Sequence, residues 1–395
     1  MFSYLIRIFS AIILTGLVTT QMSQTAHAQA FETAAKQALL YDVQTGSTLF
    51  SKDADKQIPP ASLAKLMTME VVFNALKIGS LSLDDQFLVS EDAWRRGGAQ
   101  SGGSTMFAEL NSEIRIEDLI TAVIVQSAND GCIILAEGIA GSEDAFVQLM
   151  NARAQTIGLE DSVFVNSTGL PADGQLVTMR DLVRLADHIQ REYPEYYALY
   201  SLTAFEWNNI NQRNRNPLLR MDISADGMKT GFTEESGYAI LGSTNADGRR
   251  LIAAMSGMET QDQRAREARK LLEWGRRSFS KYRIVSDDGV VGRVDVYGGE
   301  QNSVPVRPQN SLEMLLPLIG DVDSFRPRIV YDFPLRPPIA EGDQIAQLRL
   351  MRDDEVAFEA PLVAAESVEA GPIHRRALDA LSELAFGWIP DRIRP

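Results

Sequence analysis

The spacing of hydrophobic and polar positions changes along the chain between a helical and a strand-like pattern. In several segments apolar side chains recur at intervals of three and four, which is typical of helices that bury one face. This spacing predicts helices over residues 62–78, 116–126, 130–140, 143–157, 179–191 and 262–280. Strand-like runs flank the turn residues Gln44-Thr45-Gly46, so we expect residues 36–51 to form a hairpin.

A series of strands is expected after Asp226. The stretches "GMKTGFT", "GYAILGSTN" and "RRLIAAMSGM" are separated by short turns, which is the pattern of an antiparallel meander. Helices combined with an antiparallel sheet predict an α/β (α+β) fold in which a helical cluster lies beside the sheet. Residues 283–370 differ, because they alternate in short segments rich in Val, Pro, Gly and Asp, and they predict a separate, small all-β domain.

The start of the chain has the pattern of an export signal. Residues 1–30 combine Arg7, a short apolar stretch and the small residues of "AHAQA", which favour cleavage after Ala28 or Ala30. An uncleaved anchor is the alternative. In either case we expect the first folded domain to occupy residues 31–282.

The end of the chain, residues 371–395, returns to helical spacing after Gly371-Pro372. Its apolar positions fall on one face of the predicted helix: Ile373, Ala377, Leu381, Leu384 and Trp388. At about 1.5 Å per residue this helix is too short to span a bilayer, but its apolar face can lie in the interface. We therefore expect an amphipathic helix that associates with a membrane; packing of this face on the protein's own body is the alternative.

Composition narrows the chemistry. The net charge of −15 argues against a nucleic-acid partner. The single cysteine, Cys132, excludes an intrachain disulfide, and its apolar surroundings favour a small buried side chain over a nucleophile. Apart from His27 in the predicted signal, only His188 and His374 are present, without the spacing of metal ligands. We therefore expect no metal and no cofactor, and lysine is favoured over a Ser-His-Asp triad as the base for any serine chemistry.

The stretch "PPASLAKLMT" places Ser62 and Lys65 on the same side of a predicted helix. The rest of that helix is apolar nearly all round, which predicts that it is buried. Burial lowers the pKa of a lysine, and such a lysine can accept the proton of Ser62. Ser62 would also lie at the helix N-terminus, where developing negative charge is favoured. A surface helix with a capping serine is the alternative, because this motif is common by chance.

A second motif, Ser127-Ala128-Asn129, interrupts two apolar helical runs and predicts a tight turn. A hydroxyl and an amide two residues apart in such a turn can point into one cleft. The hydroxyl could relay a proton and the amide could hold a substrate amide. Taken alone, the motif consists of ordinary turn residues.

A third motif, Lys229-Thr230-Gly231, lies on a predicted strand that precedes a turn. Gly231 would let the backbone of a ligand approach closely, because it has no side chain. Lys229 and Thr230 could bind a carboxylate.

The three motifs, S-x-x-K, S-x-N and K-T-G, stand in the order and spacing of the active-site set of penicillin-recognising serine enzymes. Together with "DGMKTGFTEESGY", "NQRNRNPLL" and "ARKLLEWG", they make the chain resemble the class C low-molecular-mass penicillin-binding proteins. These are D-alanyl-D-alanine carboxypeptidases with a C-terminal β-domain and a terminal amphipathic helix. The resemblance implies a β-lactamase/transpeptidase-like fold for the first domain and a place at the periplasmic face of the bacterial inner membrane.

The resemblance also implies roles for the motif residues. Ser62 would attack the terminal D-Ala–D-Ala bond of a peptidoglycan stem pentapeptide, Lys65 would deprotonate it, and water would release the acyl-enzyme. Ser127 and Lys229 would pass a proton to the leaving D-alanine, and Asn129 would help to hold the substrate. β-Lactam antibiotics would acylate the same serine.

Further contacts to the substrate follow from the same resemblance. The backbone N–H groups of Ser62 and Phe232 would form the oxyanion hole. Arg264 would bind the terminal carboxylate of the substrate, and the nearby Arg266 is a competitor for that role. Related enzymes often carry a histidine where this chain has Phe232, so no side-chain role of that histidine is expected here.

Three other functions stay open. A DD-endopeptidase would cleave cross-links with the same residues. A class A β-lactamase needs a Glu-x-x-x-Asn setting, but Ile210 stands where that asparagine would follow Glu206. A non-catalytic penicillin-binding scaffold would not need all three motifs intact.

Overall fold

The computed structural model describes residues 31–286, 289–318, 325–352 and 355–372. The predicted export signal and nearly all of the predicted tail helix therefore lie outside the described residues. In the described part of the chain, no helix is both long enough and apolar enough to cross a membrane.

An antiparallel sheet organises the first domain. Its strands are β1 (Gln37–Asp42), β2 (Ser47–Lys52), β7 (Ala225–Thr233), β8 (Gly237–Ala246) and β9 (Arg249–Met258). They pair side by side in the order β2-β1-β9-β8-β7, within a longer sheet that β16, β12 and β11 continue beyond β2. The structure thus confirms the predicted hairpin of β1 and β2 and the predicted meander of β7, β8 and β9.

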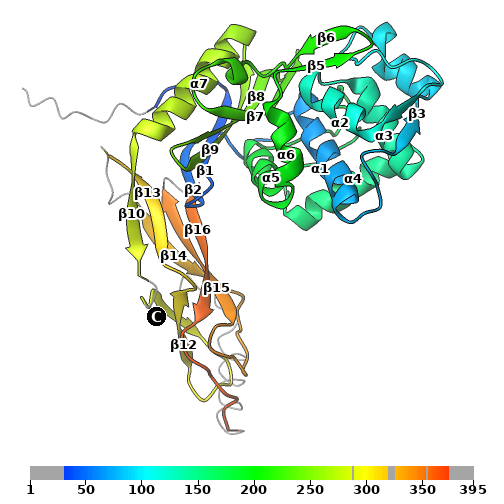
Figure 1. Cartoon of the computed structure of the whole chain (residues 1–395). Coiled ribbons are helices and arrows are strands. Elements are labelled where there is room, and N and C mark those ends of the chain that lie inside the picture. Colours follow the sequence, from blue (N-terminus) through cyan, green and yellow to red (C-terminus); the bar gives the residue numbers. More distant parts are fainter. Residues whose placement is uncertain (1–30, 287–288, 319–324, 353–354, 373–395) are drawn as a thin grey trace, which may run out of the picture. The chain divides into compact units, whose positions relative to one another are not determined.

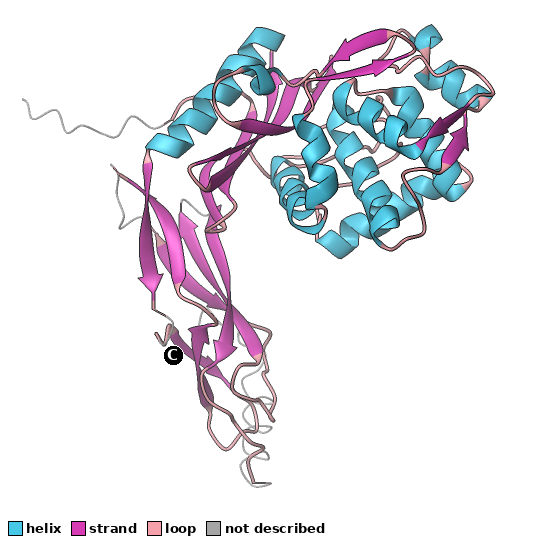
Figure 2. Cartoon of the chain, in the orientation of Figure 1, coloured by secondary structure: helices cyan, strands magenta, loops and turns pink. Residues whose placement is uncertain are grey.

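Helices cover both faces of this sheet (Figures 1 and 2). They are α1 (Lys65–Lys77), α2 (Ile116–Val125), α3 (Asn129–Ala140), α4 (Glu143–Ile157), α5 (Met179–Glu192), α6 (Pro194–Tyr197) and α7 (Gln261–Arg277), with short helical turns η1 (Ala61–Ala64), η2 (Ala93–Gly97), η3 (Ala99–Ser101), η4 (Ala198–Ser201) and η5 (Pro217–Arg220). Because successive strand residues point to opposite faces, Leu39 packs into the core beneath α1 to α5, whereas Leu40 packs into a second core beneath α7.

Two predicted helices differ from those observed. The helix expected over 62–78 begins as the 3₁₀ turn η1 and becomes α-helical only at Lys65, so Ser62 lies in the turn that precedes α1. The helix expected over 262–280 ends at Arg277, and strand β10 begins at Phe279. The Phe279 ring packs edge-on against Trp274 of the last helical turns, which fixes the direction in which the chain leaves the helix.

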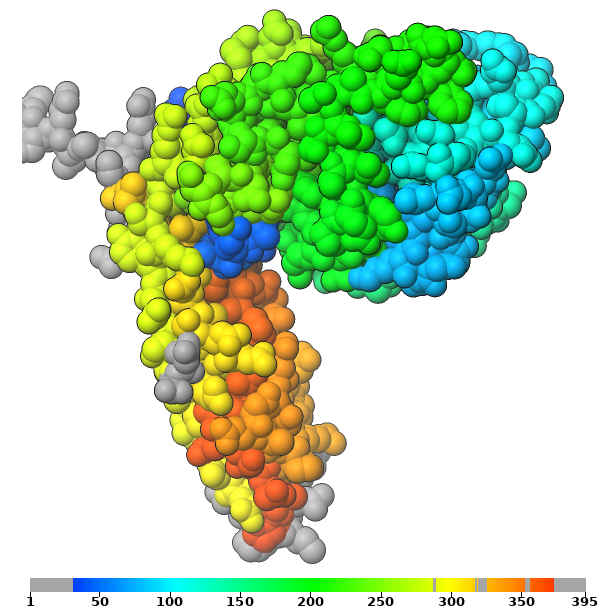
Figure 3. All heavy atoms as spheres, viewed as in Figure 1, coloured from blue at the N-terminus to red at the C-terminus, as the bar shows by residue number. Residues whose placement is uncertain are grey.

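The C-terminal region forms the expected all-β domain. Its strands are β10 (Phe279–Val285), β11 (Gly292–Asp295), β12 (Ser303–Pro308), β13 (Leu312–Pro317), β14 (Arg326–Val330), β15 (Gln344–Arg352) and β16 (Glu355–Ala364). A hydrophobic core of its own, including Val304, Leu348 and Leu362, lies between them. Strand β16 pairs with β2 at Phe358 and Ser47. In Figure 3 these residues, coloured yellow to red, form one region that adjoins residues of the first domain coloured blue.

Two small two-stranded sheets are absent from the sequence prediction. They pair β3 (Gln86–Leu88) with β4 (Glu113–Arg115), and β5 (Ala204–Trp207) with β6 (Ile210–Arg213). Strands of three or four residues are too short for an alternating pattern to stand out from the surrounding loops.

Candidate active site

Ser62 and Lys65 face each other at the start of α1. The Lys65 ammonium donates hydrogen bonds to Ser62 Oγ at 3.1 Å and to Asn129 Oδ1 at 2.8 Å, and it also contacts the carbonyl oxygen of Thr168. The lysine is 1 % exposed, so the prediction of a buried helix is confirmed. The hydroxyl and the ammonium of the first motif therefore meet at hydrogen-bonding distance.

The environment of Lys65 favours its neutral form. The pKa of its ammonium is lowered to about 8, chiefly by burial and in part by the positive charge of Arg215, while Cys132 and Asp130 oppose the shift. Roughly a tenth of the lysine is then neutral near neutral pH, compared with less than a thousandth for an ordinary lysine. A neutral amine within 3.1 Å of a hydroxyl can accept its proton.

The Ser127-Ala128-Asn129 motif forms the predicted turn between α2 and α3. Ser127 adopts a left-handed backbone conformation with φ 67°. The next acidic residue holds the turn in place, since the Asp130 carboxylate accepts hydrogen bonds from Thr105 Oγ1 at 2.5 Å and from the Met106 N–H at 3.0 Å. The buried Ser127 hydroxyl has no hydrogen-bond partner among the described residues, so it is available to a bound substrate.

The third motif lies on β7, as predicted, and packs against the turn that carries Ser62. A Cβ atom at Gly231 would lie 3.1 Å from Ala61 Cβ and 3.3 Å from Ser62 N. From the sequence we expected a ligand backbone to approach this glycine, and that role stays a prediction. In the structure it is the backbone beside Ser62 that approaches β7, so only glycine fits there without displacement.

The residues beside Gly231 on β7 differ in their exposure to solvent. Lys229 is buried, and burial lowers the pKa of its ammonium well below the usual value, helped by the charge of Lys65. Thr230 is also buried. Phe232, by contrast, is 51 % exposed and packs on the Tyr238 ring with 4.3 Å between ring centroids. Its side chain therefore forms part of the rim of the site, while its backbone stays on the strand.

Arg264 lies in the first turn of α7 and is buried against β8. Its guanidinium sits 5.6 Å from the centroid of the Tyr238 ring, and its Nε has no hydrogen-bond partner among the described residues. Burial lowers the pKa of Arg264 to about 10. Arg266 is exposed and lines a groove along α7 with Arg269, Trp274 and Arg277. The buried position beside the sheet therefore favours Arg264 over Arg266 as a site residue.

Two residues that reasoning from the sequence did not assign also belong to this region. Arg215, between β6 and η5, lowers the pKa of both Lys65 and Lys229 by its charge. Thr168 brings its carbonyl to the Lys65 ammonium from the loop after α4. Neither position has a pattern of its own in the sequence, although Arg215 falls within the stretch "NQRNRNPLL".

The cysteine and the two histidines considered from the sequence have no part in the proposed site. The free thiol of Cys132 is fully buried, and burial raises its pKa to about 12, which fits a structural side chain. His188 Nε2 lies 3.5 Å from Glu70 Oε1, two helical turns along α1 from Ser62. His374 lies outside the described residues. Within the described chain, no group of three or more His, Cys, Asp or Glu side chains could hold a metal ion.

Comparisons with known proteins find relatives over most of the chain. The sequence profile of the family described as D-alanyl-D-alanine carboxypeptidase matches residues 22–260, and the profile of the penicillin-binding protein 5 C-terminal domain matches residues 279–370. The D-alanyl-D-alanine carboxypeptidase DacC of Escherichia coli is 34% identical over 353 residues, covering 89% of this chain and 88% of its own.

Solved structures show the same likeness. Penicillin-binding protein 5 of Haemophilus influenzae is 34% identical with a TM-score of 0.69, and the match covers 86% of this chain and 98% of that one. Penicillin-binding protein D2 of Listeria monocytogenes, solved in an ampicillin-bound form, is 29% identical with a TM-score of 0.55 over 62% of this chain and 99% of its own. The chain belongs to the D-alanyl-D-alanine carboxypeptidase family of serine penicillin-binding proteins.

Proposed function

We propose that this chain removes the terminal D-alanine from peptidoglycan stem pentapeptides through an acyl-enzyme on Ser62, with Lys65 as the general base. The observation that carries this proposal is the hydrogen bond of 3.1 Å between Lys65 Nζ and Ser62 Oγ, made by a lysine whose pKa burial lowers to about 8. In the first step the serine proton passes to the neutral amine, and Ser62 Oγ bonds to the carbonyl carbon of the penultimate D-alanine.

The negative charge of the tetrahedral intermediate needs hydrogen-bond donors. The N–H groups of Ser62 and Phe232 are suited to this role, because β7 packs closely enough on Ser62 to exclude any side chain at Gly231. When the peptide C–N bond breaks, the leaving nitrogen takes a proton through the Ser127 hydroxyl, which has no competing partner among the described residues. Water then cleaves the ester on Ser62 and restores the free hydroxyl.

The substrate's terminal carboxylate is expected to bind on the Arg264 side of the site. Four cationic groups influence one another there: Lys65, Lys229, Arg215 and Arg264. A carboxylate relieves the repulsion between these groups, and the Thr230 hydroxyl and the Arg264 guanidinium can donate hydrogen bonds to it. Asn129 would hold a substrate amide. The carboxylate of a β-lactam antibiotic meets the same groups, so we propose that β-lactams acylate Ser62 covalently.

A β-lactamase activity is disfavoured. Glu206, the carboxylate nearest in sequence to the arrangement that a class A enzyme needs, is exposed on β5. No observation on the described residues favours a scaffold without activity, because the three motifs meet in one place.

We also propose how the chain is divided and located. The proposed parts are an export signal over 1–30, a catalytic domain over 31–282, a β-domain over 283–370 and an amphipathic helix over 371–395 that holds the exported enzyme on the periplasmic face of the inner membrane. The separate core of the β-domain supports the second boundary, although β10 crosses it. The apolar spacing of the tail supports the last part.

The test is to incubate the mature protein with a stem pentapeptide and measure free D-alanine, with Ser62→Ala as the control. We expect release by the wild type and none by the variant. Equal release by both proteins would refute the role of Ser62. Cleavage of a cross-linked dimer without release from the pentapeptide would identify an endopeptidase instead.

A further inference from the structure

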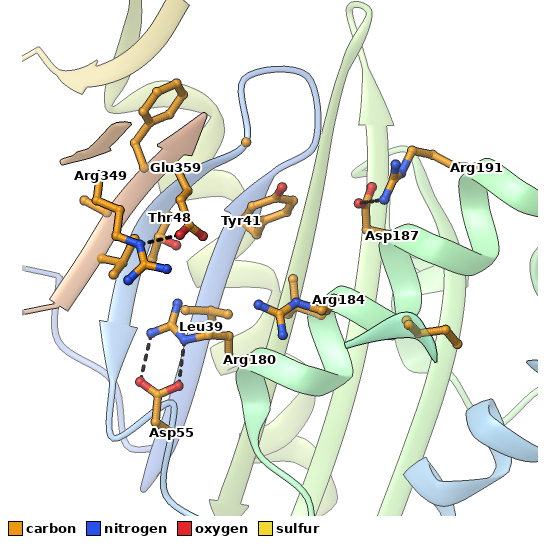
Figure 4. A pocket seen from close by; sticks show the side chains of 16 residues that line it. Leu39, Tyr41, Thr48, Asp55, Arg180, Arg184, Asp187, Arg191, Arg349 and Glu359 are labelled. Carbon is orange, nitrogen blue, oxygen red and sulfur yellow. Dashed lines mark hydrogen bonds and ion pairs between the residues drawn. The ribbon is translucent and has the colours of Figure 1, made fainter. Parts of the chain in front are cut away.

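A cavity of about 680 Å³ lies away from the candidate active site (Figure 4). Its lining comes from β1, β2 and α5 of the first domain and from β15 and β16 of the β-domain. Its volume falls within the range of small-ligand sites, about 300–1,000 Å³. None of the residues assigned to the proposed reaction lines this cavity.

Many of the side chains that line the cavity are charged. Four arginines and three carboxylates line it, which leaves an excess of one positive charge (4 − 3 = +1) in a protein of net charge −15. Three of the arginines are paired within the lining: Arg180 with Asp55 at 2.6 Å, Arg191 with Asp187 at 2.8 Å and Arg349 with Glu359 at 2.6 Å.

The fourth arginine, Arg184, has no close ion pair with a carboxylate of the lining. It contacts the Gly158 carbonyl through Nη1, and Asp181 lies 3.7 Å from the same nitrogen. Among the described residues no partner is found for its Nε or Nη2. An arginine with a free edge can bind a carboxylate with two parallel hydrogen bonds.

Asp187, one helical turn from Arg184 on α5, brings a negatively charged carboxylate to the cavity. It is only 9% exposed, and Oδ2 accepts the ion pair from Arg191 while Oδ1 has no hydrogen-bond partner among the described residues. A buried carboxylate oxygen without a partner is costly, because it has lost its water. A donor that entered the cavity would satisfy it.

Tyr41 stands close to both groups and keeps its proton. Burial, and next the charge of Asp187, raise the pKa of its hydroxyl to about 12. In Figure 4 this ring projects from β1 toward the face of α5 that carries Arg184 and Asp187. Apolar side chains, among them Val183 and Val356, complete the wall.

We propose that this cavity binds a short peptide that carries both a free ammonium and a free carboxylate group. The ammonium donates to Asp187 Oδ1 and the carboxylate pairs with Arg184. Residues three apart on a helix have Cβ atoms about 5–6 Å apart, and an extended dipeptide spans about 7 Å, so the two charges of a dipeptide match the two subsites. That the peptide is a D-alanyl one rests on the proposed function; the demand for both charges does not.

The cavity is distinct from the site of acylation. Strand β1 at the cavity and strand β7 at Ser62 are separated by three strand spacings in the order β1-β9-β8-β7, which is roughly 14 Å at 4.8 Å per spacing. A peptide in the cavity therefore does not occupy the place of a substrate on Ser62. It contacts the first domain and the β-domain at once, so its binding links the two.

The experiment uses the full mature protein in excess benzylpenicillin, which keeps the active site blocked, and titrates it with D-alanyl-D-alanine by calorimetry. We expect one binding site per chain. N-acetyl-D-alanyl-D-alanine, which lacks the ammonium, and the C-terminal amide of the dipeptide, which lacks the carboxylate, should each bind about tenfold more weakly or worse, as expected for the loss of one charge-assisted hydrogen bond.

Two variants and a control assign the binding to the cavity. Asp187→Asn and Arg184→Gln should each weaken dipeptide binding by about tenfold or more and leave D-alanine release from the pentapeptide unchanged. Arg328→Gln, at an exposed arginine of β14 outside the cavity, should leave both unchanged. Unchanged release also shows that the variants fold.

The inference is overturned if the blocked wild type does not bind the dipeptide, if both variants bind it like the wild type, or if the two blocked analogues bind equally well. Release of D-alanine without binding of the dipeptide overturns this inference alone. Binding of the dipeptide without any release of D-alanine overturns the proposed function alone.

Discussion

Lys65 combines two properties that a general base on a serine requires, which are proximity and an accessible neutral form. Its ammonium lies 3.1 Å from Ser62 Oγ and is almost completely buried. An exposed lysine at the same distance would stay charged and could not accept a proton near neutral pH. The desolvation that makes this lysine unfavourable for folding is therefore what suits it to the proposed role of a base.

The first prediction concerns the pH dependence of acylation. Because the pKa of Lys65 is lowered to about 8, the neutral form grows as pH rises through that value, and the second-order rate constant for acylation by benzylpenicillin should rise with it and then level off. Stopped-flow or gel-based labelling across this range gives the profile. A rate that does not change with pH would contradict the role of Lys65.

A substitution of the same residue isolates the proton transfer. Lys65→Arg keeps the positive charge but cannot become neutral, so we expect acylation to fall by roughly 10²–10⁴-fold. Lys56→Arg, at an exposed lysine, is the matched control and should acylate like the wild type.

The second prediction concerns Gly231. In Gly231→Ala the new methyl would lie 3.1 Å from Ala61 Cβ and 3.3 Å from Ser62 N, so β7 and the turn before α1 must move apart. A displacement of this kind at an oxyanion hole should slow acylation by about 10²-fold. Rates and thermal unfolding are measured together. An unchanged acylation rate would mean that β7 does not contribute to the site.

At the scale of elements, the helix that carries Lys65 is held by a buried ion pair. Glu70 of α1 is fully buried, and Arg153 of α4 donates to its carboxylate through Nε at 3.0 Å. Tyr193 donates to Glu70 at 3.1 Å. Burial alone would raise the pKa of Glu70, but the nearby His188 and the hydrogen bonds from Arg153 and Tyr193 bring it below its usual value. These partners therefore keep the buried Glu70 carboxylate in its charged form.

The third prediction follows from this pair. Arg153→Met leaves the Glu70 carboxylate buried without its cation, so we expect the free energy of unfolding to fall by about 3 kcal/mol. The double variant Glu70→Gln/Arg153→Met removes the uncompensated charge and should regain a large part of that loss. Urea denaturation of both variants and of Glu70→Gln completes the cycle. A loss in the double variant equal to the sum of the losses in the two single variants would show that the pair is not coupled.

Elements with strong periodicity were predictable from the sequence, and elements fixed by distant contacts were not. The apolar spacing around Lys65 predicted its burial, and the turns between β7, β8 and β9 predicted the meander. The 3₁₀ turn at Ser62 was not predicted; it packs against Gly231 of β7, a contact between residues far apart in the sequence that no local pattern indicates. Arg215 reaches the site only through the tertiary fold.

At the scale of the whole molecule, the structure describes the motif residues and the charged cavity, but not the C-terminal tail. The three sequence motifs, which extend from residue 62 to residue 231, meet on η1, α1, the turn before α3 and β7. The charged cavity joins residues as far apart as Tyr41 and Glu359, and no local pattern could have indicated it. The tail beyond residue 372 lies outside the described residues, so its membrane association stays a prediction from spacing.

The fourth prediction tests that tail. Removal of residues 371–395 should shift the mature protein from the vesicle pellet to the supernatant in sedimentation with lipid vesicles, because the apolar face of the predicted helix is lost. Release of D-alanine from the pentapeptide should persist, since no described site residue lies in the deleted segment. Pelleting of the truncated protein to the same extent as the mature protein would refute the proposed anchor.

The most direct test of the central claim locates the covalent bond. The mature protein is labelled with benzylpenicillin, digested and analysed by mass spectrometry, with Ser62→Ala treated in parallel. We expect a penicilloyl adduct on the peptide that contains Ser62 and none on the variant. An adduct on another residue, or labelling of Ser62→Ala at the wild-type rate, would contradict the assignment of Ser62 as the nucleophile.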